Sequence, residues 1–220
     1  MIKRVHLTIA AAVLCAVFGA TSPAQMNMNF FQKPSIADIF RPVVGNGSVY
    51  ETTRDQKTET LEMSVISKDS VDGREAYWLE FGHTDARSGG LAYAKMLVTK
   101  DDFQFHRMVV QPPGQDPIEM PFNPSANRQS QLHDEVEKWH KVGTETITVP
   151  AGTFSCDHWA RDDGKGDVWA SSKVTPMSLV KETTPNNSMV LVKQITDAKD
   201  HITGTPRKFD PQQMMQHQKP

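Results

Sequence analysis

Apolar and polar residues alternate along most of the chain after about residue 45, which is the period of a β-strand. The clearest alternation covers residues 61–65 (LEMSV) and residues 77–81 (YWLEF), on either side of Asp72-Gly73. Asp-Gly between two alternating runs is typical of a tight hairpin turn. This stretch therefore predicts two antiparallel strands joined by a short turn.

The same alternation predicts further strands, separated by turns at intervals of about ten residues. A second pair is expected over residues 91–99 and 103–111. In 103–111 we expect two faces, one with Phe103, Phe105, Arg107 and Val109, and one with His106, Met108 and Val110. Later strands are expected at 140–149, 153–160, 168–171, 177–183 and 188–196. About nine or ten short strands at this spacing favour a mainly-β domain over alternating β and α units.

A few segments depart from this pattern. Short helices are expected at 35–40, where Ser35 can cap the first turn and Pro42 stops the last, at 128–139, and near 210–214. Residues 112–127 hold five prolines, each of which lacks a backbone donor. This proline-rich segment is expected to form a long ordered loop or an edge segment. Gly89-Gly90 predicts a further break between strands.

The N-terminus has the pattern of a secretory signal peptide. Lys3 and Arg4 precede an apolar run over residues 5–20, and Ser22-Pro23-Ala24 offers small residues for cleavage. The run is shorter than the roughly 20 residues that a spanning helix needs. We expect cleavage after Ala24, and no lipid on Cys15, because Leu14 stands where a lipoprotein signal needs a small residue. The predicted organisation is a signal peptide (1–24), an N-terminal segment with a short helix (25–44), one β domain (45–204) and a polar tail (205–220).

Composition narrows the function classes. The 220 residues carry 24 Lys and Arg against 26 Asp and Glu, a formal net charge of −2. This balance argues against a nucleic-acid partner, which favours a basic surface. With Cys15 removed by cleavage, Cys156 is left alone, so no internal disulfide is expected. The fold must then depend on its core.

One stretch resembles a known family. The motif GTETITVPAGTF at residues 143–154 is followed by WASSKV at 169–174 and by Leu179-Val180-Lys181. Together, over residues 141–196, these are similar to bacterial exported proteins of the outer-membrane lipoprotein carrier (LolA-like) superfamily and related domains of unknown function. Met177-Ser178 replaces the glycine that the family has before Leu179. The resemblance implies a curved antiparallel sheet, a half-barrel with a few short helices, around an apolar cavity. Members of the superfamily carry acyl chains or lipoproteins across the periplasm.

An apolar cavity is the leading binding hypothesis, because burying each CH₂ of an acyl chain contributes about 0.8 kcal/mol. The chain has 11 methionines, and this flexible side chain suits adaptable binding surfaces. The alternative is that the same side chains fill an ordinary core. The candidate cavity residues are Met63, Val65, Leu79, Phe81, Met96, Met108, Val110, Met189 and Leu191.

Other candidate sites carry weaker signals. Cys156 and His158 lie two residues apart, hence on one strand face, and both residue types bind Zn²⁺ or Cu. Two ligands are too few for a metal site, and a thiol–imidazole pair on one strand lacks the usual catalytic arrangement. Asp162, Asp163 and Asp167 lie in a glycine turn without calcium-loop spacing. Arg107 is expected to pair with Glu119 or Glu145. We therefore expect no cofactor and no enzymatic activity.

The sequence thus predicts an exported soluble protein, periplasmic or secreted, without a transmembrane span once the signal is removed. The expected function is binding of an apolar or amphipathic ligand, such as a lipid or a lipoprotein acyl chain. An alternative is an interaction module whose sheet edge or proline-rich loop binds another envelope protein. A metal- or thiol-dependent enzyme is the third alternative.

Overall fold

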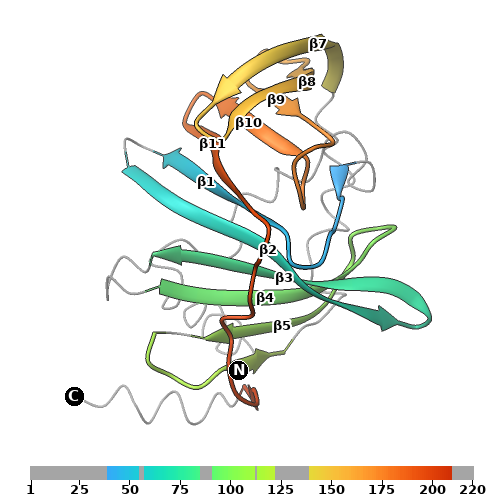
Figure 1. Cartoon of the computed structure of the whole chain (residues 1–220), viewed down its shortest axis with the longest axis vertical. Helices are drawn as coiled ribbons and strands as arrows, with labels where there is room; N and C mark the ends of the chain where they lie inside the picture. Colours follow the sequence, from blue (N-terminus) through green and yellow to red (C-terminus); the bar gives the residue numbers. More distant parts are fainter. Residues whose placement is uncertain (1–38, 55–56, 85–90, 112, 122–138, 210–220) are drawn as a thin grey trace, which may run out of the picture.

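A computed structural model describes residues 39–54, 57–84, 91–111, 113–121 and 139–209 of the chain. These residues form one open, curved sheet with the strand order β12-β6-β5-β4-β3-β2-β1-β11-β10-β9-β8-β7 (Figure 1). The predicted mainly-β curved sheet is confirmed. The strands are β1 (Gly47–Arg54), β2 (Lys57–Val71), β3 (Arg74–Thr84), β4 (Leu91–Thr99), β5 (Phe105–Gln111), β6 (Ile118–Met120), β7 (Trp139–Val149), β8 (Gly152–Arg161), β9 (Asp167–Ala170), β10 (Leu179–Thr184), β11 (Asn187–Ile195) and β12 (Arg207–Lys208).

Two antiparallel meanders meet in the middle of the sheet. Strands β1 to β6 follow one another, strands β7 to β11 do the same, and β11 then pairs with β1. The short β12 pairs in parallel with β6, so the sheet is mixed. In Figure 1 the β7–β11 meander lies above the β1–β6 meander, and the chain before β1 enters between them.

The hairpin between β2 and β3 forms as the sequence predicts. Asp72 and Gly73 have positive φ angles of 51° and 76°. A turn with two left-handed residues matches the twist of the strands on either side. The proline-rich segment contributes β6, a three-residue strand that pairs with β5 on one side and with the two-residue β12 on the other, so it lies next to the edge of the sheet.

Some predictions differ from the structure or lie outside the described residues. Trp139, the expected end of a helix, instead begins β7, where it pairs with Arg161 of β8. The signal peptide, the Gly89-Gly90 break, most of the expected helix at 35–40 and the helices at 128–138 and 210–214 fall outside the described ranges. Within those ranges the structure contains no helix of the length and apolar character that crossing a bilayer requires.

A β-bulge overturns the predicted faces of β5. Val98 pairs with Phe105 but Leu97 pairs with Arg107, so one extra residue is accommodated in β5. Such an insertion shifts the alternation by one position. Phe105 and Met108 therefore share a face, although simple alternation separates them.

Strand register also shows which residues share the inner face of the sheet. Met63 pairs with Ser48, and two residues further along β1, Tyr50 pairs with Leu191. From β11, Met189 pairs with Glu182, which in turn pairs with Val168. Paired residues point to the same side of a sheet. By the same register, all nine candidate cavity residues lie on this inner face.

The inner face of β2 to β5 carries the larger apolar cluster. Ile39 and Phe40 lie over it, and Phe40 contacts Phe103 edge to face with ring centroids 4.9 Å apart. Met177, from the loop between β9 and β10, belongs to the same cluster. The chain before β1 and a loop from the other meander therefore close this face together.

Candidate functional site

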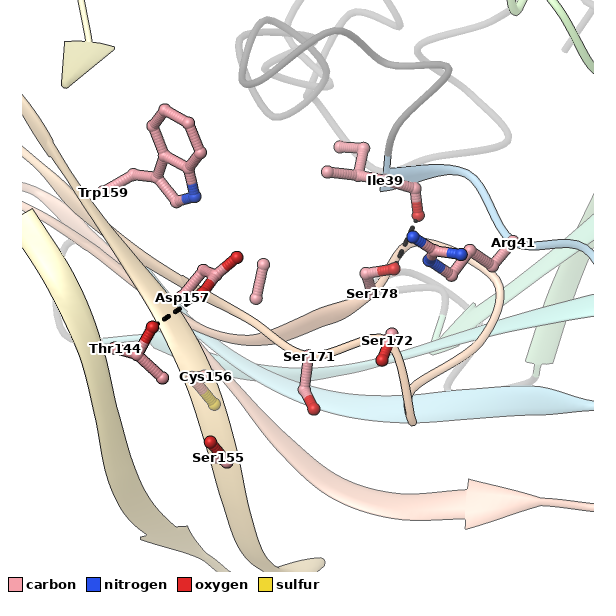
Figure 2. A pocket seen from close by; sticks show the side chains of 11 residues that line it. Ile39, Arg41, Thr144, Ser155, Cys156, Asp157, Trp159, Ser171, Ser172 and Ser178 are labelled. Carbon is pink, nitrogen blue, oxygen red and sulfur yellow. Dashed lines mark hydrogen bonds between the residues drawn. The ribbon is translucent and has the colours of Figure 1, made fainter. Parts of the chain in front are cut away.

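A pocket of about 360 Å³ lies on the inner face, where β8 and β9 approach the chain before β1 (Figure 2). Trp159 pairs with Val168, so it projects from the same face as the apolar cluster. Ser155 and Asp157 follow on that face by alternation. The pocket is lined by Ile39, Arg41, Thr144, Ser155, Cys156, Asp157, Trp159, Ala170, Ser171, Ser172 and Ser178.

Hydrogen bonds fix one wall of the pocket to another. The backbone N–H of Arg41 donates to the carbonyl of Pro176 at 2.7 Å. The Ser178 hydroxyl donates to the backbone carbonyl of Ile39 at 2.9 Å. The Ser48 hydroxyl donates to the backbone carbonyl of Thr175 at 2.5 Å. The segment 39–41 and the loop 171–178 are therefore held together before any ligand arrives.

The pocket has two charged side chains, Asp157 and Arg41, and only Asp157 has a partner of opposite charge among the described residues. Lys141 lies 2.8 Å from the Asp157 carboxylate, and the Thr144 hydroxyl donates to the same oxygen at 3.0 Å. The hydrogen bond from Lys141 is the main reason why the pKa of Asp157 is below its ordinary value. The exposed guanidinium of Arg41 has no ion pair within the described part of the chain. The pocket thus carries one compensated negative charge and one uncompensated positive charge.

Several polar groups at the pocket are also unpaired. Among the residues that the structure describes, the hydroxyls of Ser155, Ser171 and Ser172 and the indole N–H of Trp159 form no hydrogen bond within the protein. Each of these groups can donate a hydrogen bond. The pocket is therefore supplied with donors that water or a ligand must satisfy.

The predicted cavity residues do not line this pocket. They pack instead into three apolar clusters of the core. Met63, Val65, Leu79, Phe81 and Met96 belong to the cluster under Phe40, Val110 belongs to a small cluster with Ala92 and Ala94, and Met189 and Leu191 belong to a cluster with Tyr50 and Phe154. Met108 is half-buried and packs against the first two. Their role as a ligand cavity stays a prediction.

Cys156 lies at the edge of the pocket, but its thiol points away from Trp159 and Asp157 (Figure 2). The buried Sγ lies 3.7 Å from the carbonyl of Phe154. Burial raises the pKa of this thiol to about 11, with the nearby carboxylates of Glu145 and Asp157 acting in the same direction. At neutral pH the group is therefore a protonated thiol and a poor nucleophile.

His158 does not share a site with Cys156. Its Nε2 lies 2.7 Å from Asp167 and its Nδ1 lies 2.9 Å from Glu145, and the ring stacks on Trp169 at 4.6 Å. Both ring nitrogens can donate together only in the doubly protonated imidazolium. His158 thus links β7, β8 and β9. Within the described ranges, no group of three or more His, Cys, Asp and Glu side chains is placed to hold a metal ion.

The acidic turn between β8 and β9 is divided among separate partners. Asp162 contacts His140, Asp163 contacts Arg161, and Asp167 contacts His158. These carboxylates therefore do not converge. On the other meander, Arg107 Nε donates to Glu119 at 2.7 Å, which agrees with the first of the two predicted pairings.

Sequence reasoning missed Arg41, Trp159 and the serines of loop 171–178. One signal was available, since placing Phe154, Cys156 and His158 on one face puts Ser155, Asp157 and Trp159 on the other. Strand alternation could not predict that Arg41 lines the pocket, because Arg41 belongs to a segment more than a hundred residues before β8.

Comparison with known proteins gives weak likenesses. No protein-family model matches the chain, and no curated protein matches it. A protein classed as a lipoprotein, from Parabacteroides distasonis, is 15% identical with a TM-score of 0.37, over 71% of this chain and 97% of its own. A protein classed as exported, with a YmcC-like fold, from Bacteroides fragilis is 15% identical with a TM-score of 0.36, over 71% of this chain and 98% of its own.

The structure of MucB is 13% identical with a TM-score of 0.42, over 77% of this chain and 60% of MucB. MucB in complex with MucA(peri) is 12% identical with a TM-score of 0.41, over 80% of this chain and 58% of that one. At such low sequence identity, no residue role in these proteins can be assigned to a residue of the pocket.

Proposed function

We propose that this protein is exported and binds an amphipathic ligand in the pocket between β8, β9 and the segment 39–41, without catalysing a reaction. The observation that carries the proposal is the position of the pocket at a boundary between polar and apolar surface. Ile39 belongs both to the pocket and to the apolar cluster of β2 to β5. The unpaired donors lie on the other walls.

Such a boundary suits a ligand with two kinds of surface. A polar end satisfies the donors of the serine hydroxyls, and an apolar part lies against Ile39, Ala170 and the indole of Trp159. Ligand sites commonly have volumes of about 300–1,000 Å³, with apolar walls and a few placed polar groups. The pocket, at about 360 Å³, is at the lower end of that range. A single short acyl chain therefore fits the proposal better than a complete lipoprotein anchor.

The chemistry of the lining supports binding rather than catalysis. The Cys156 thiol is protonated at neutral pH and points away, and the Asp157 carboxylate is held by Lys141 and Thr144. A nucleophile needs a neighbouring base or a lowered pKa. Neither Cys156 nor Asp157 has such an arrangement with another lining residue.

Native mass spectrometry of protein purified from an exporting host, without added ligand, tests the proposal. We expect a bound amphiphile whose mass is lost on denaturation. Ser155→Tyr fills the pocket and should remove the adduct. Thr153→Tyr is the matched control, because Thr153 lies two residues earlier on the same face of β8 but does not line the pocket. The proposal is wrong if Ser155→Tyr keeps the adduct, or if the wild type carries none and takes up neither decanoate nor decyl maltoside.

The free edge of β7 favours a second function, binding of a protein partner. β7 ends the sheet, and no described strand pairs with its outer edge. Val142, at a bulge in this strand, is 56% exposed. Open strand edges pair readily with extended segments of other chains. Val142→Lys should abolish co-purification of such a partner, whereas the pocket variant Ser155→Tyr should leave it unchanged.

A further inference from the structure

The two ends of the pocket differ in charge. Figure 2 shows Arg41 at one end, near Ser178, and Trp159 with Asp157 and Thr144 at the other end. The negative charge of Asp157 is compensated by Lys141 at 2.8 Å. The positive charge of Arg41 has no protein partner within the described residues. An anionic group is therefore attracted to the Arg41 end and gains nothing from the Asp157 end.

The Arg41 end is also held in position in advance. The backbone N–H of Arg41 donates to the carbonyl of Pro176, and the carbonyl of Ile39, two residues earlier, accepts from the Ser178 hydroxyl. The backbone at and just before Arg41 is therefore attached to the loop 171–178. Groups fixed before binding lose less entropy when the ligand arrives. Ser171 and Ser172, from the same loop, have free hydroxyls that can donate to an oxyanion.

We propose that the polar end of the ligand is an oxyanion, a carboxylate or a phosphate, bound by the Arg41 guanidinium with help from the hydroxyls of Ser171 and Ser172. This inference rests on the proposed function and names the ligand class of the same pocket. The planar guanidinium donates two parallel hydrogen bonds to a carboxylate or phosphate, which are stronger than bonds between neutral groups. The apolar part of the ligand then points toward Ile39 and Trp159.

Isothermal titration with matched amphiphiles tests the inference. The probes are decanoate, decyl phosphate and the neutral decyl maltoside, each below its critical micelle concentration, together with inorganic phosphate alone. We expect the two anionic amphiphiles to bind the wild type at least tenfold more tightly than the maltoside. Arg41→Gln should weaken the anionic amphiphiles by about tenfold, as for the loss of one charge-assisted interaction, and leave the maltoside unchanged.

Lys173→Gln is the matched control, because it removes one positive charge from the adjacent loop but does not line the pocket. It should change none of the affinities by more than about twofold, a screened long-range effect. Arg41→Lys keeps the charge without the planar fork and should bind the anions with intermediate affinity. Since the exposed guanidinium forms no ion pair or hydrogen bond with a described residue, these variants should unfold at the wild-type temperature. Ser172→Ala, at an exposed lining residue, should weaken the anionic amphiphiles and leave the maltoside unchanged.

The outcomes separate this inference from the proposed function. If the maltoside binds as tightly as the anions and Arg41→Gln changes nothing, the inference is wrong while amphiphile binding stands. If no amphiphile binds the wild type, both proposals are wrong. Binding of inorganic phosphate as tight as that of decyl phosphate would overturn the amphiphile assignment and leave a simple oxyanion site. Equal weakening by Lys173→Gln would show that general charge, and not Arg41, attracts the ligand.

Discussion

The same face of the sheet is closed at one end and open at the other. Over β2 to β5 the inner face carries Met63, Leu79 and Phe81, and Ile39 and Phe40 cover it. Over β8 and β9 that face carries Ser155, Asp157 and Trp159, and the covering segment ends there with Arg41. In β8 the buried apolar residues, Phe154 and Cys156, alternate with these and pack in a second cluster with Tyr50 and Leu191.

This contrast shows how a continuous sheet provides both a core and a site. Phe154 and Cys156 supply the buried apolar side chains of β8, while Ser155, Asp157 and Trp159 of the same strand line the pocket. Ser155, Asp157 and Trp159 lie outside the three apolar clusters, so the Ser155 hydroxyl and the Trp159 indole N–H can remain unpaired.

The largest expected effect comes from uncovering the closed end. Phe40→Ala removes a side chain that is only 2% exposed and that packs edge to face on Phe103 and Tyr77. Truncation of a buried phenylalanine typically lowers the free energy of unfolding by about 3–5 kcal/mol. Urea unfolding measures the change. Val44→Ala, at a position that is 50% exposed, should change it by less than about 0.5 kcal/mol.

Because Phe40 lies between Ile39 and Arg41, we also expect Phe40→Ala to weaken amphiphile binding. If the variant loses stability and binds normally, the pocket does not depend on the covering segment.

The next effect concerns the outer face of the closed end. Glu80, 2% exposed, accepts hydrogen bonds from the backbone N–H of His201 at 3.0 Å, from His201 Nδ1 at 2.7 Å and from the N–H of Ile202 at 3.3 Å. Glu80→Ala leaves the N–H and Nδ1 of His201 without this acceptor, while the N–H of Ile202 keeps its hydrogen bond to Asp200 at 2.9 Å. The loss should cost about 2–3 kcal/mol. Hydrogen exchange should show lost protection at the backbone N–H of His201 while decanoate affinity is kept. Glu59→Ala, on an exposed part of β2, should leave exchange unchanged.

A smaller effect is expected where the two meanders join. The Tyr50 hydroxyl donates to the carbonyl of Leu179 at 3.2 Å, across 129 residues of sequence. Tyr50→Phe deprives that buried carbonyl of this donor and should lower the free energy of unfolding by about 1–2 kcal/mol. Thr52→Val, which removes an exposed hydroxyl from the same strand, should cost less than about 0.5 kcal/mol. Equal losses in the two variants would show that the Tyr50 bond does not join the meanders.

The smallest effect at neutral pH concerns Cys156. Burial raises the pKa of its thiol from the ordinary value near 9 to about 11. The folded state therefore binds this proton more tightly than the unfolded state. The corresponding stability is fully present below pH 9 and is lost as the pH rises toward 11. The wild type should lose more stability than Cys156→Ala between pH 9 and 11, as measured by urea unfolding at each pH. Parallel curves for the two proteins would contradict the raised pKa.

Local patterns predicted most of the strands. Asp72-Gly73 specified its turn because two consecutive residues with positive φ cost little free energy only in sequences such as Asp-Gly. The 143–154 motif likewise predicted the hairpin of β7 and β8, and the prolines indicated that residues 112–127 lie outside the centre of the sheet. Trp139 was wrongly assigned to a helix because it has helical spacing with Leu132 and Val136. In the structure it pairs with Arg161 of β8, a residue that local spacing does not reveal.

The candidate site was predicted less well, for a physical reason. The apolar candidates were selected because they alternate, and register does place them on one face. Alternation cannot tell whether such a face binds a ligand or packs into the core. The Cys156–His158 pair was close in sequence, but Glu145 and Asp167, from neighbouring strands, engage the histidine instead.

The sequence by itself determined the period of the strands, their turns and the polar or apolar character of each strand face, because these depend on residues within a few positions of one another. Only the tertiary structure decided which face of β8 lines the pocket, where the bulge in β5 shifts the alternation, and that Arg41 lies beside the loop 171–178. These features depend on strand pairing and on hydrogen bonds between segments more than a hundred residues apart, such as that from Arg41 to Pro176.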